Sequence, residues 1–177
     1  RTGATGEGEY LDNLHQEILY QKGLSHLRQG ERDRAARTYE SLSRTIPEEK
    51  LWPIDKEYWE FHCGRNEFVT LDRYRKAMRL RYGQPRSVED FAFKSQVMNY
   101  ELMRPMFESF VAHKPTSTGL IQWMLNSAWP EMYWQLYDYY LVPNGAFYGA
   151  KKGCQPLSPV YNYKDHSICL VNDELEK

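Results

Sequence analysis

The sequence lacks the features that mark several common classes of protein. No apolar run approaches the roughly 18 residues that predict a membrane-spanning helix, and the mean hydropathy is −0.75. Its 23 Lys and Arg residues nearly balance 24 Asp and Glu residues. The resulting net charge of −1 gives no electrostatic reason to expect a nucleic-acid or anionic-membrane partner. With 41% hydrophobic and 27% charged residues, the composition is that of an ordinary folded domain.

Cysteine and the familiar catalytic motifs are equally sparse. Cys63, Cys154 and Cys169 are too few and too scattered for a disulfide framework, and they lack the close pairing of zinc sites. The five histidines show no metal-ligand spacing, so we predict neither a metal site nor a cofactor. A Gly-rich phosphate loop, an HExxH helix and a GxSxG elbow are absent. Carboxylates are plentiful, but the sequence alone selects no acid–base pair among them.

Residues 1–37 are predicted to form a helical N-terminal segment. Leucines at three-to-four spacing indicate one helix, which Gly30 ends, and a second helix is expected from about Arg32 to Arg44. Small and aromatic residues over 16–47 resemble a single tetratricopeptide repeat: Gly23, Gly30, Ala35, Tyr39, Leu42 and Pro47. One repeat cannot bury its own hydrophobic face. Two amphipathic helices unrelated to that repeat therefore remain the alternative.

Residues 38–118 are predicted to consist of helices and loops. The stretch 47–62, dense in Trp and Pro, is predicted as a long loop packed by its own aromatic side chains. Helices are expected over 70–82 and 87–113, the second with a kink at Pro105. Its predicted buried stripe contains Val88, Phe91, Met98, Leu102, Met106 and Phe110.

Strand signals begin at residue 119. The run GLIQWML, residues 119–125, predicts a short, fully buried strand. A turn at Asn144-Gly145 and a short helix should follow, and then two strands within LSPVYNY and HSICLVN. Because two strands are marginal by themselves, they are expected to have further partners, and the sequence is expected to be truncated at its C-terminus.

Aromatic and small polar residues gather at the end of the predicted strand of residues 119–125 and directly after it. Indole faces such as those of Trp123 and Trp129 stack on the apolar face of a pyranose, while Asn126 and Ser127 can hydrogen-bond its hydroxyls. If the strand belongs to a β/α barrel, its C-terminal end is the place where active sites lie. The alternative is that these aromatic side chains only pack the barrel against a neighbouring domain.

The segment from GLIQWMLNSAWP to ICLVND resembles the end of the catalytic barrel in glycoside hydrolase family 2. The resemblance is to the branch of exo-β-glucosaminidases, β-mannosidases and mannosylglycoprotein endo-β-mannosidases. YESLSRTIPEEKLWP, EFHCGRNEF, LDRYRKAMRLRYG and FAFKSQVMNYELMRPMFESF resemble the segments that precede it there. The match, over about 38–173, implies an α/β fold: the C-terminal portion of a TIM (β/α)8 barrel, mostly helical. The domains would be 1–37, the helical segment; 38–156, the partial barrel; and 157–177, the start of an Ig-like β-sandwich.

The resemblance also implies an activity and a substrate site. Such enzymes are retaining glycosidases that use two carboxylates, and the substrate would be a β-linked mannoside or glucosaminide. Trp123 would be the platform under the sugar at the cleavage subsite. Asn126, Ser127 and Trp129 would line the same pocket, with His62 on a nearby loop.

The catalytic carboxylates of this family have no counterpart in the sequence. Gln29 stands about where the nucleophile should be, and Glu31 lacks the surrounding motif. Glu7 and Glu9 do not match the acid/base residue either. We therefore assign no catalytic residue and expect the chain alone to be nearly inert. Its partners would be the carbohydrate substrate and the remainder of the barrel or a partner chain. The alternative is a helical protein-interaction module led by residues 10–47.

The sequence gives little information on location. The chain begins at Arg1 without a signal-like start, so it is expected to be processed, trimmed or excerpted. The family resemblance favours a secreted or periplasmic protein.

Overall fold

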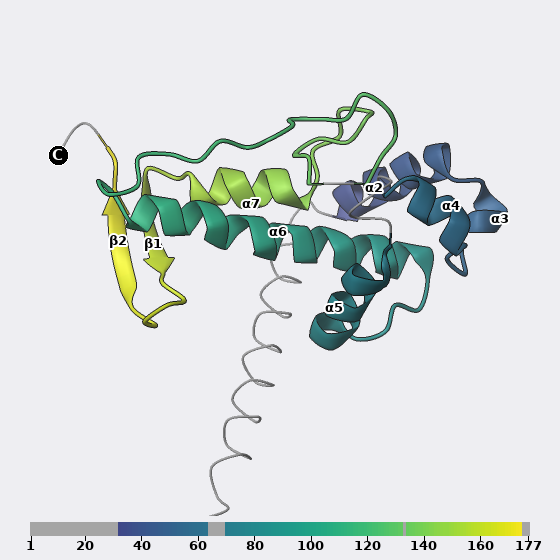
Figure 1. The fold of residues 1–177 in the computed structure, drawn as a ribbon, viewed down its shortest axis with the longest axis horizontal. Coiled ribbons are helices and arrows are strands. Elements are labelled where there is room, and N and C mark those ends of the chain that lie inside the picture. The colour runs from purple at the N-terminus through teal and green to yellow at the C-terminus, as the bar shows by residue number, and fades with distance from the viewer. Residues whose placement is uncertain (1–31, 64–69, 133, 175–177) are drawn as a thin grey trace, which may run out of the picture.

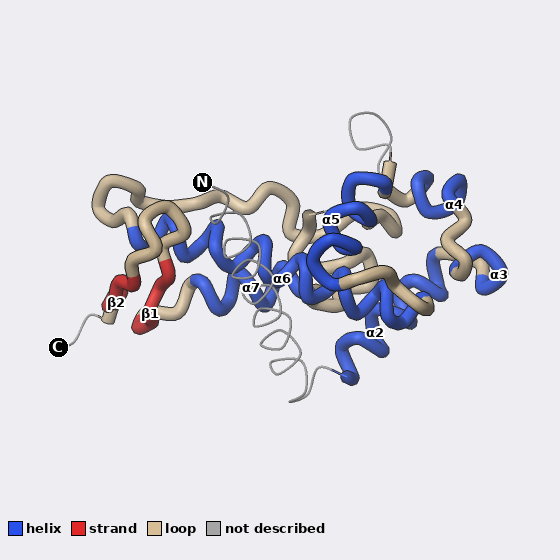
Figure 2. Tube along the Cα trace, turned by 90° about the horizontal axis from the view of Figure 1, so that it is seen from below, coloured by secondary structure: helices blue, strands red, loops and turns tan. Residues whose placement is uncertain are grey.

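The computed structural model describes residues 32–63, 70–132 and 134–174. Its elements, in chain order, are α2 (Arg32–Thr45), α3 (Glu48–Leu51), α4 (Lys56–Phe61), α5 (Asp72–Tyr82), α6 (Val88–Ala112), α7 (Gly145–Gly153), β1 (Leu157–Tyr161) and β2 (Ile168–Asn172). α6 is the long central helix, with α7 beside it (Figure 1). The helices α2, α3 and α4 gather near one end of α6, and the two strands lie near the other, as Figure 2 also shows.

The helices expected over 32–44, 70–82 and 87–113 are confirmed as α2, α5 and α6. The first helix of the predicted N-terminal hairpin lies outside the described residues, as do Gln29, Glu31 and both acidic residues before residue 10. Within the described part of the chain, α2 packs against α6 and α3. None of the described helices is both long enough and apolar enough to cross a membrane.

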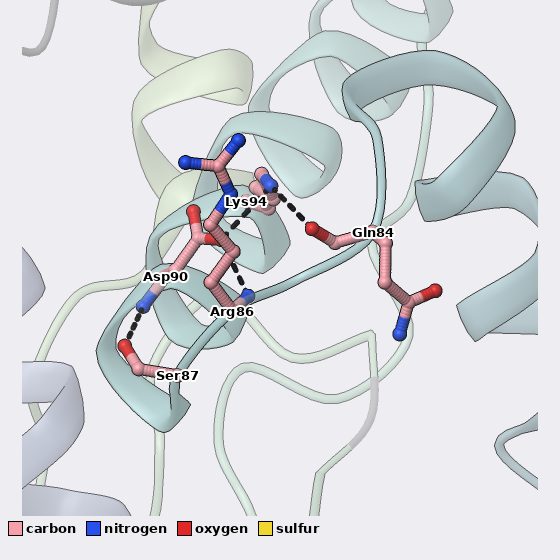
Figure 3. A network of polar contacts seen from close by, with 5 residues as sticks. All are labelled: Gln84, Arg86, Ser87, Asp90 and Lys94. Atoms are coloured by element: carbon pink, nitrogen blue, oxygen red, sulfur yellow. Dashed lines mark hydrogen bonds and ion pairs between the residues drawn. The ribbon is translucent and has the colours of Figure 1, made fainter.

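A polar network fixes the beginning of α6 (Figure 3). The spacing of Ser87 and Asp90 predicts a capping box variant, and Ser87 Oγ accepts a hydrogen bond from the Asp90 backbone N–H at 3.2 Å. Asp90 Oδ2 accepts from the Arg86 backbone N–H and from Lys94 Nζ, both at 2.9 Å. Lys94 is 6% exposed and also donates to the Gln84 carbonyl at 3.3 Å. The buried ammonium group is therefore paired, which offsets its desolvation.

The predicted loop over 47–62 is wrong, because this stretch contains α3 and α4. Asp55 caps α4 by accepting a hydrogen bond from the Tyr58 backbone N–H. The two short helices turn Leu51 and Trp59 into the core, where Trp59 is 0% exposed. The Trp59 ring meets the Phe91 ring edge-on, with centroids 5.2 Å apart. Burial of these side chains stabilises helical turns that local composition did not predict.

The stripe predicted along α6 is buried only in its first half. The buried members are Val88, Phe91 and Met98. The others, Leu102, Met106 and Phe110, are 48%, 50% and 37% exposed. In this second half Met103 is buried instead, together with Ala146 and Ala150 of α7. The core therefore moves to another face of α6 because α7 packs there, while the helix continues through Pro105.

α7 and the hairpin β1–β2 agree with the sequence. Asn144 caps α7 by accepting hydrogen bonds from the backbone N–H groups of Ala146 and Phe147, at 2.9 and 3.3 Å. The antiparallel pairing runs from Leu157↔Asn172 to Tyr161↔Ile168. The last two predicted strands and the short helix before them are therefore confirmed.

The buried strand predicted over 119–125 is wrong. This segment has no regular structure, and Ile121 is 94% exposed. A strand needs a neighbour for its backbone N–H and C=O groups. The two strands of the described ranges pair with each other, far along the chain from residue 125. The described residues are mostly helical, with one two-stranded sheet. The expected C-terminal portion of a β/α barrel stays a prediction.

The cysteines offer a direct test of this packing. Cys63 is 5% exposed, and burial raises the pKa of its thiol to about 12, whereas Cys154 is exposed. We expect iodoacetamide at pH 8 to modify Cys154 in the folded chain and to spare Cys63, because the thiolate is the reactive form. Peptide mass spectrometry would measure both, with guanidinium-unfolded chain as the control in which both react. Equal labelling in the folded chain would contradict the described core.

Candidate functional site

Two predicted site residues from distant segments lie side by side. His62 follows α4, and Trp129 belongs to the long connection between α6 and α7. Their ring centroids are 5.4 Å apart, with an interplanar angle of 32°. Phe61 packs edge-on against Trp129 at 5.5 Å. Trp129 remains 37% exposed, so part of its indole is open to a ligand.

Backbone contacts hold the His62 segment against this connection. His62 Nδ1 lies 2.6 Å from the Pro130 carbonyl oxygen, and the Met132 backbone N–H donates to the His62 carbonyl at 2.7 Å. A carbonyl oxygen can only accept, so Nδ1 carries the proton in this contact. In the neutral ring, Nε2 is then a hydrogen-bond acceptor. The end of α4 and residues 130–132 therefore form one connected unit.

Ser127 faces the protein interior. It is 5% exposed, and its Oγ accepts a hydrogen bond from Nε2 of Gln135, which is 2% exposed. The neighbouring Asn126 is exposed, and its Nδ2 donates to the Ser127 carbonyl at 3.4 Å. Of the two polar candidates, Asn126 can thus meet a ligand directly, while the Ser127 hydroxyl is engaged in holding the connection.

Trp123 lies on the surface of the same connection, with 73% of its area exposed. Gln122 Nε2 donates to the carbonyl oxygens of Trp123 and Trp134, at 3.2 and 3.1 Å. The Leu125 carbonyl accepts from the backbone N–H groups of Leu136 and Tyr137, at 3.1 and 3.0 Å. The segment 122–127 therefore lies along 134–137, without forming a ladder.

A cavity of about 790 Å³ is lined mainly by α2, α5, α6 and residues from 130–132 and 134–144, together with Trp59 of α4 and Cys63. The five predicted site residues are not among its described lining, although Pro130 and Gln135 are. Tyr74 lines it too, and its hydroxyl donates to the Ser95 carbonyl at 3.3 Å. Burial raises the pKa of Tyr74 to about 12, so this phenol is neutral at physiological pH. Four of the five candidate residues lie on the connection that also contributes to the cavity, but none of the five lines the cavity itself.

Sequence patterns did not reveal the residues that hold this arrangement, chiefly Gln135 and Asn144. Asn144 was visible as a turn residue, but nothing in the sequence pairs Gln135 with Ser127. The described residues contain no group of three or more His, Cys, Asp or Glu side chains that could hold a metal ion. Chemically, the arrangement offers aromatic faces, an amide and an imidazole acceptor.

Known proteins match about three quarters of this chain. No protein-family model matches it. It is 38% identical over 139 residues to an exo-β-D-glucosaminidase of Arthroderma benhamiae, covering 75% of this chain and 16% of that protein. It is 28% identical over 142 residues to a mannosylglycoprotein endo-β-mannosidase of Lilium longiflorum, covering 78% and 14%. The crystal structure of an Amycolatopsis orientalis exo-chitosanase matches with a TM-score of 0.67 at 36% identity, covering 76% and 17%. The chain thus spans less than a fifth of each protein.

Proposed function

This chain belongs to the family of glycosidases that contains exo-β-D-glucosaminidases and mannosylglycoprotein endo-β-mannosidases, and we propose that it supplies a sugar-binding part of a retaining β-glycosidase. The observation that carries the proposal is the pairing of His62 with Trp129, two residues expected at a sugar subsite and brought together from distant segments. The substrate is a β-linked glucosaminide or mannoside.

Each of these candidate side chains suits a pyranose. The open indole of Trp129 can stack on the C–H face of a sugar ring, a contact that is both apolar and orienting. His62 Nε2 can accept a hydrogen bond from a sugar hydroxyl, because the ring proton lies on Nδ1, which donates to the Pro130 carbonyl oxygen. Asn126 offers an exposed amide that can donate and accept. Trp123 adds a second exposed indole on the same connection.

We assign no catalytic carboxylate to this chain. Retaining glycosidases need two carboxyl groups about 5 Å apart, one as nucleophile and one as acid/base. No carboxylate of the described residues is assigned to either role. We propose that further polypeptide, as the remainder of a barrel or as a partner chain, completes the site. The chain alone is then expected to bind sugar without cleaving it.

Replacing Trp129 with Ala should weaken binding of p-nitrophenyl β-D-glucosaminide at least about tenfold, because the stacking surface is lost. Ligand-observed NMR titration gives the Kd, and release of p-nitrophenol in the same sample reports any cleavage. The control is Tyr163→Ala. Tyr163 is 53% exposed and lies in sequence between β1 and β2. These two strands lie near the opposite end of α6 from α4 (Figure 1).

The titration tests three points separately: the role of Trp129, sugar binding by the chain, and the need for further polypeptide in catalysis. An equal loss of affinity in the Trp129 and Tyr163 variants would show that Trp129 is not part of the sugar subsite. A wild-type chain that binds neither the β-D-glucosaminide nor the corresponding β-mannoside would refute the proposed sugar-binding role. Release of p-nitrophenol by the chain alone would show that it contains its own catalytic pair.

A further inference from the structure

We propose that Gln135 is a positioning residue, whose buried amide sets the place of the sugar-binding segment 126–129. The identity of the ligand rests on the proposed function, whereas the positioning itself can be measured without a ligand. Gln135 is 2% exposed, so its side chain acts through Ser127 and not by touching sugar. This contact would determine how firmly the Trp129 side chain is held in place.

One contact joins two buried side chains. Gln135 Nε2 donates to Ser127 Oγ, and Ser127 lies between the exposed residues Asn126 and Trp129 in sequence. The segment has no helix or strand of its own to hold it. A buried donor left without its acceptor costs free energy, so the pair resists separation. Position 127 is therefore held to residue 135 by a side-chain contact.

Further hydrogen bonds connect Gln135 to the helices. Asn144 Nδ2 donates to the Gln135 carbonyl at 2.6 Å, and the Asn144 backbone N–H donates to the Leu136 carbonyl at 3.1 Å. Asn144 also caps α7 through its Oδ1. The next residue, Gly145, donates its backbone N–H to Gln96 Oε1 on α6 at 2.6 Å. A chain of hydrogen bonds and adjacent residues therefore connects Ser127 to the central helix α6.

Trp129 is consequently held from two sides. On one side, His62 contacts the Pro130 carbonyl and the Trp129 ring. On the other, Ser127 is held through Gln135. Two fixed points around one aromatic residue restrict its orientation, and such preorganisation lowers the cost of binding a ligand. Loss of the Gln135 amide should leave only the His62 side in place.

The test uses the whole chain labelled with 5-fluorotryptophan. In fluorine NMR, Gln135→Met, which keeps the buried volume but removes the amide, should move or broaden the Trp129 resonance, as assigned with Trp129→Phe. The Trp59 resonance, from the core, should stay in place. Ser127→Ala should have the same effect, and the double variant should add nothing further, as expected of one shared interaction. The control is Gln155→Met, at an exposed glutamine after α7.

A sugar titration then links position to binding. We expect Gln135→Met to weaken binding of p-nitrophenyl β-D-glucosaminide about tenfold, the effect of one buried hydrogen bond. An unmoved Trp129 resonance in both single variants would overturn the positioning role, whatever the titration gives. Simultaneous movement of the Trp59 resonance would overturn it too, because Gln135 would then support the fold in general. A wild-type chain that binds no sugar would reject the proposed function, while the fluorine spectra would still decide the role of Gln135.

Discussion

Replacing Gly145 with Ala should strongly destabilise the contact between α7 and α6. A Cβ atom at this position would lie 2.0 Å from the Gln96 carbonyl oxygen and 2.9 Å from the carbonyl carbon. Both atoms are backbone, so neither can rotate away as a flexible side chain would. The same approach supports the hydrogen bond from the Gly145 N–H to Gln96 Oε1. We expect the free energy of unfolding to fall by about 3 kcal/mol, at the upper end of overpacking effects.

The loss should appear as a fall in Tm of roughly 6–12 °C, measured by circular dichroism at 222 nm. Gly119→Ala is the matched control, because a Cβ atom there would have nothing within 4 Å. Its effect should stay within about 0.5 kcal/mol. If both variants have the same Tm as the wild type, α7 does not pack on α6 as described.

Replacing Trp59 with Ala should cost about 3–5 kcal/mol of unfolding free energy, the usual range for truncating a buried aromatic residue. Trp59 is 0% exposed and packs edge-on against Phe91. Its indole N–H also donates to the Lys50 carbonyl at 3.1 Å, which connects α4 to α3. Truncation therefore opens a cavity and removes a hydrogen bond at the same place.

Urea unfolding, followed by circular dichroism, would measure this loss. Tyr58→Ala is a control one residue away on α4, where the side chain is 41% exposed. We expect that variant to lose less than about 1 kcal/mol. Comparable losses at both positions would indicate that Trp59 is not the buried centre of the core.

Trp59 and Gly145 each support a different part of the candidate site. Trp59 fixes α4, and His62 follows directly after that helix. Gly145 fixes the start of α7, next to Asn144, which holds Gln135. The candidate sugar-binding residues themselves have little regular structure. Their geometry therefore depends on how firmly these neighbouring helices are packed.

The sequence by itself determined the elements whose signals are local. The capping pattern at Ser87 and the turn at Asn144-Gly145 predict where α6 and α7 begin. In the structure, each of these two side chains accepts from a backbone N–H group two or three residues away. The β-prone runs LSPVYNY and HSICLVN similarly predict the two strands. The motifs from YESL to QWMLNSAWP also indicate the glycosidase family, and the relatives confirm it.

Only the tertiary structure decided which segments meet. The apolar run 119–125 reads as a strand, but a strand requires a pairing partner, and the described residues supply none there. Residues 47–62 read as a loop, yet burial of Trp59 stabilises two short helices. The contacts of His62 with Trp129 and of Gln135 with Ser127 leave no periodic trace in the sequence. They depend on side chains packed in three dimensions, and local propensity does not encode that packing.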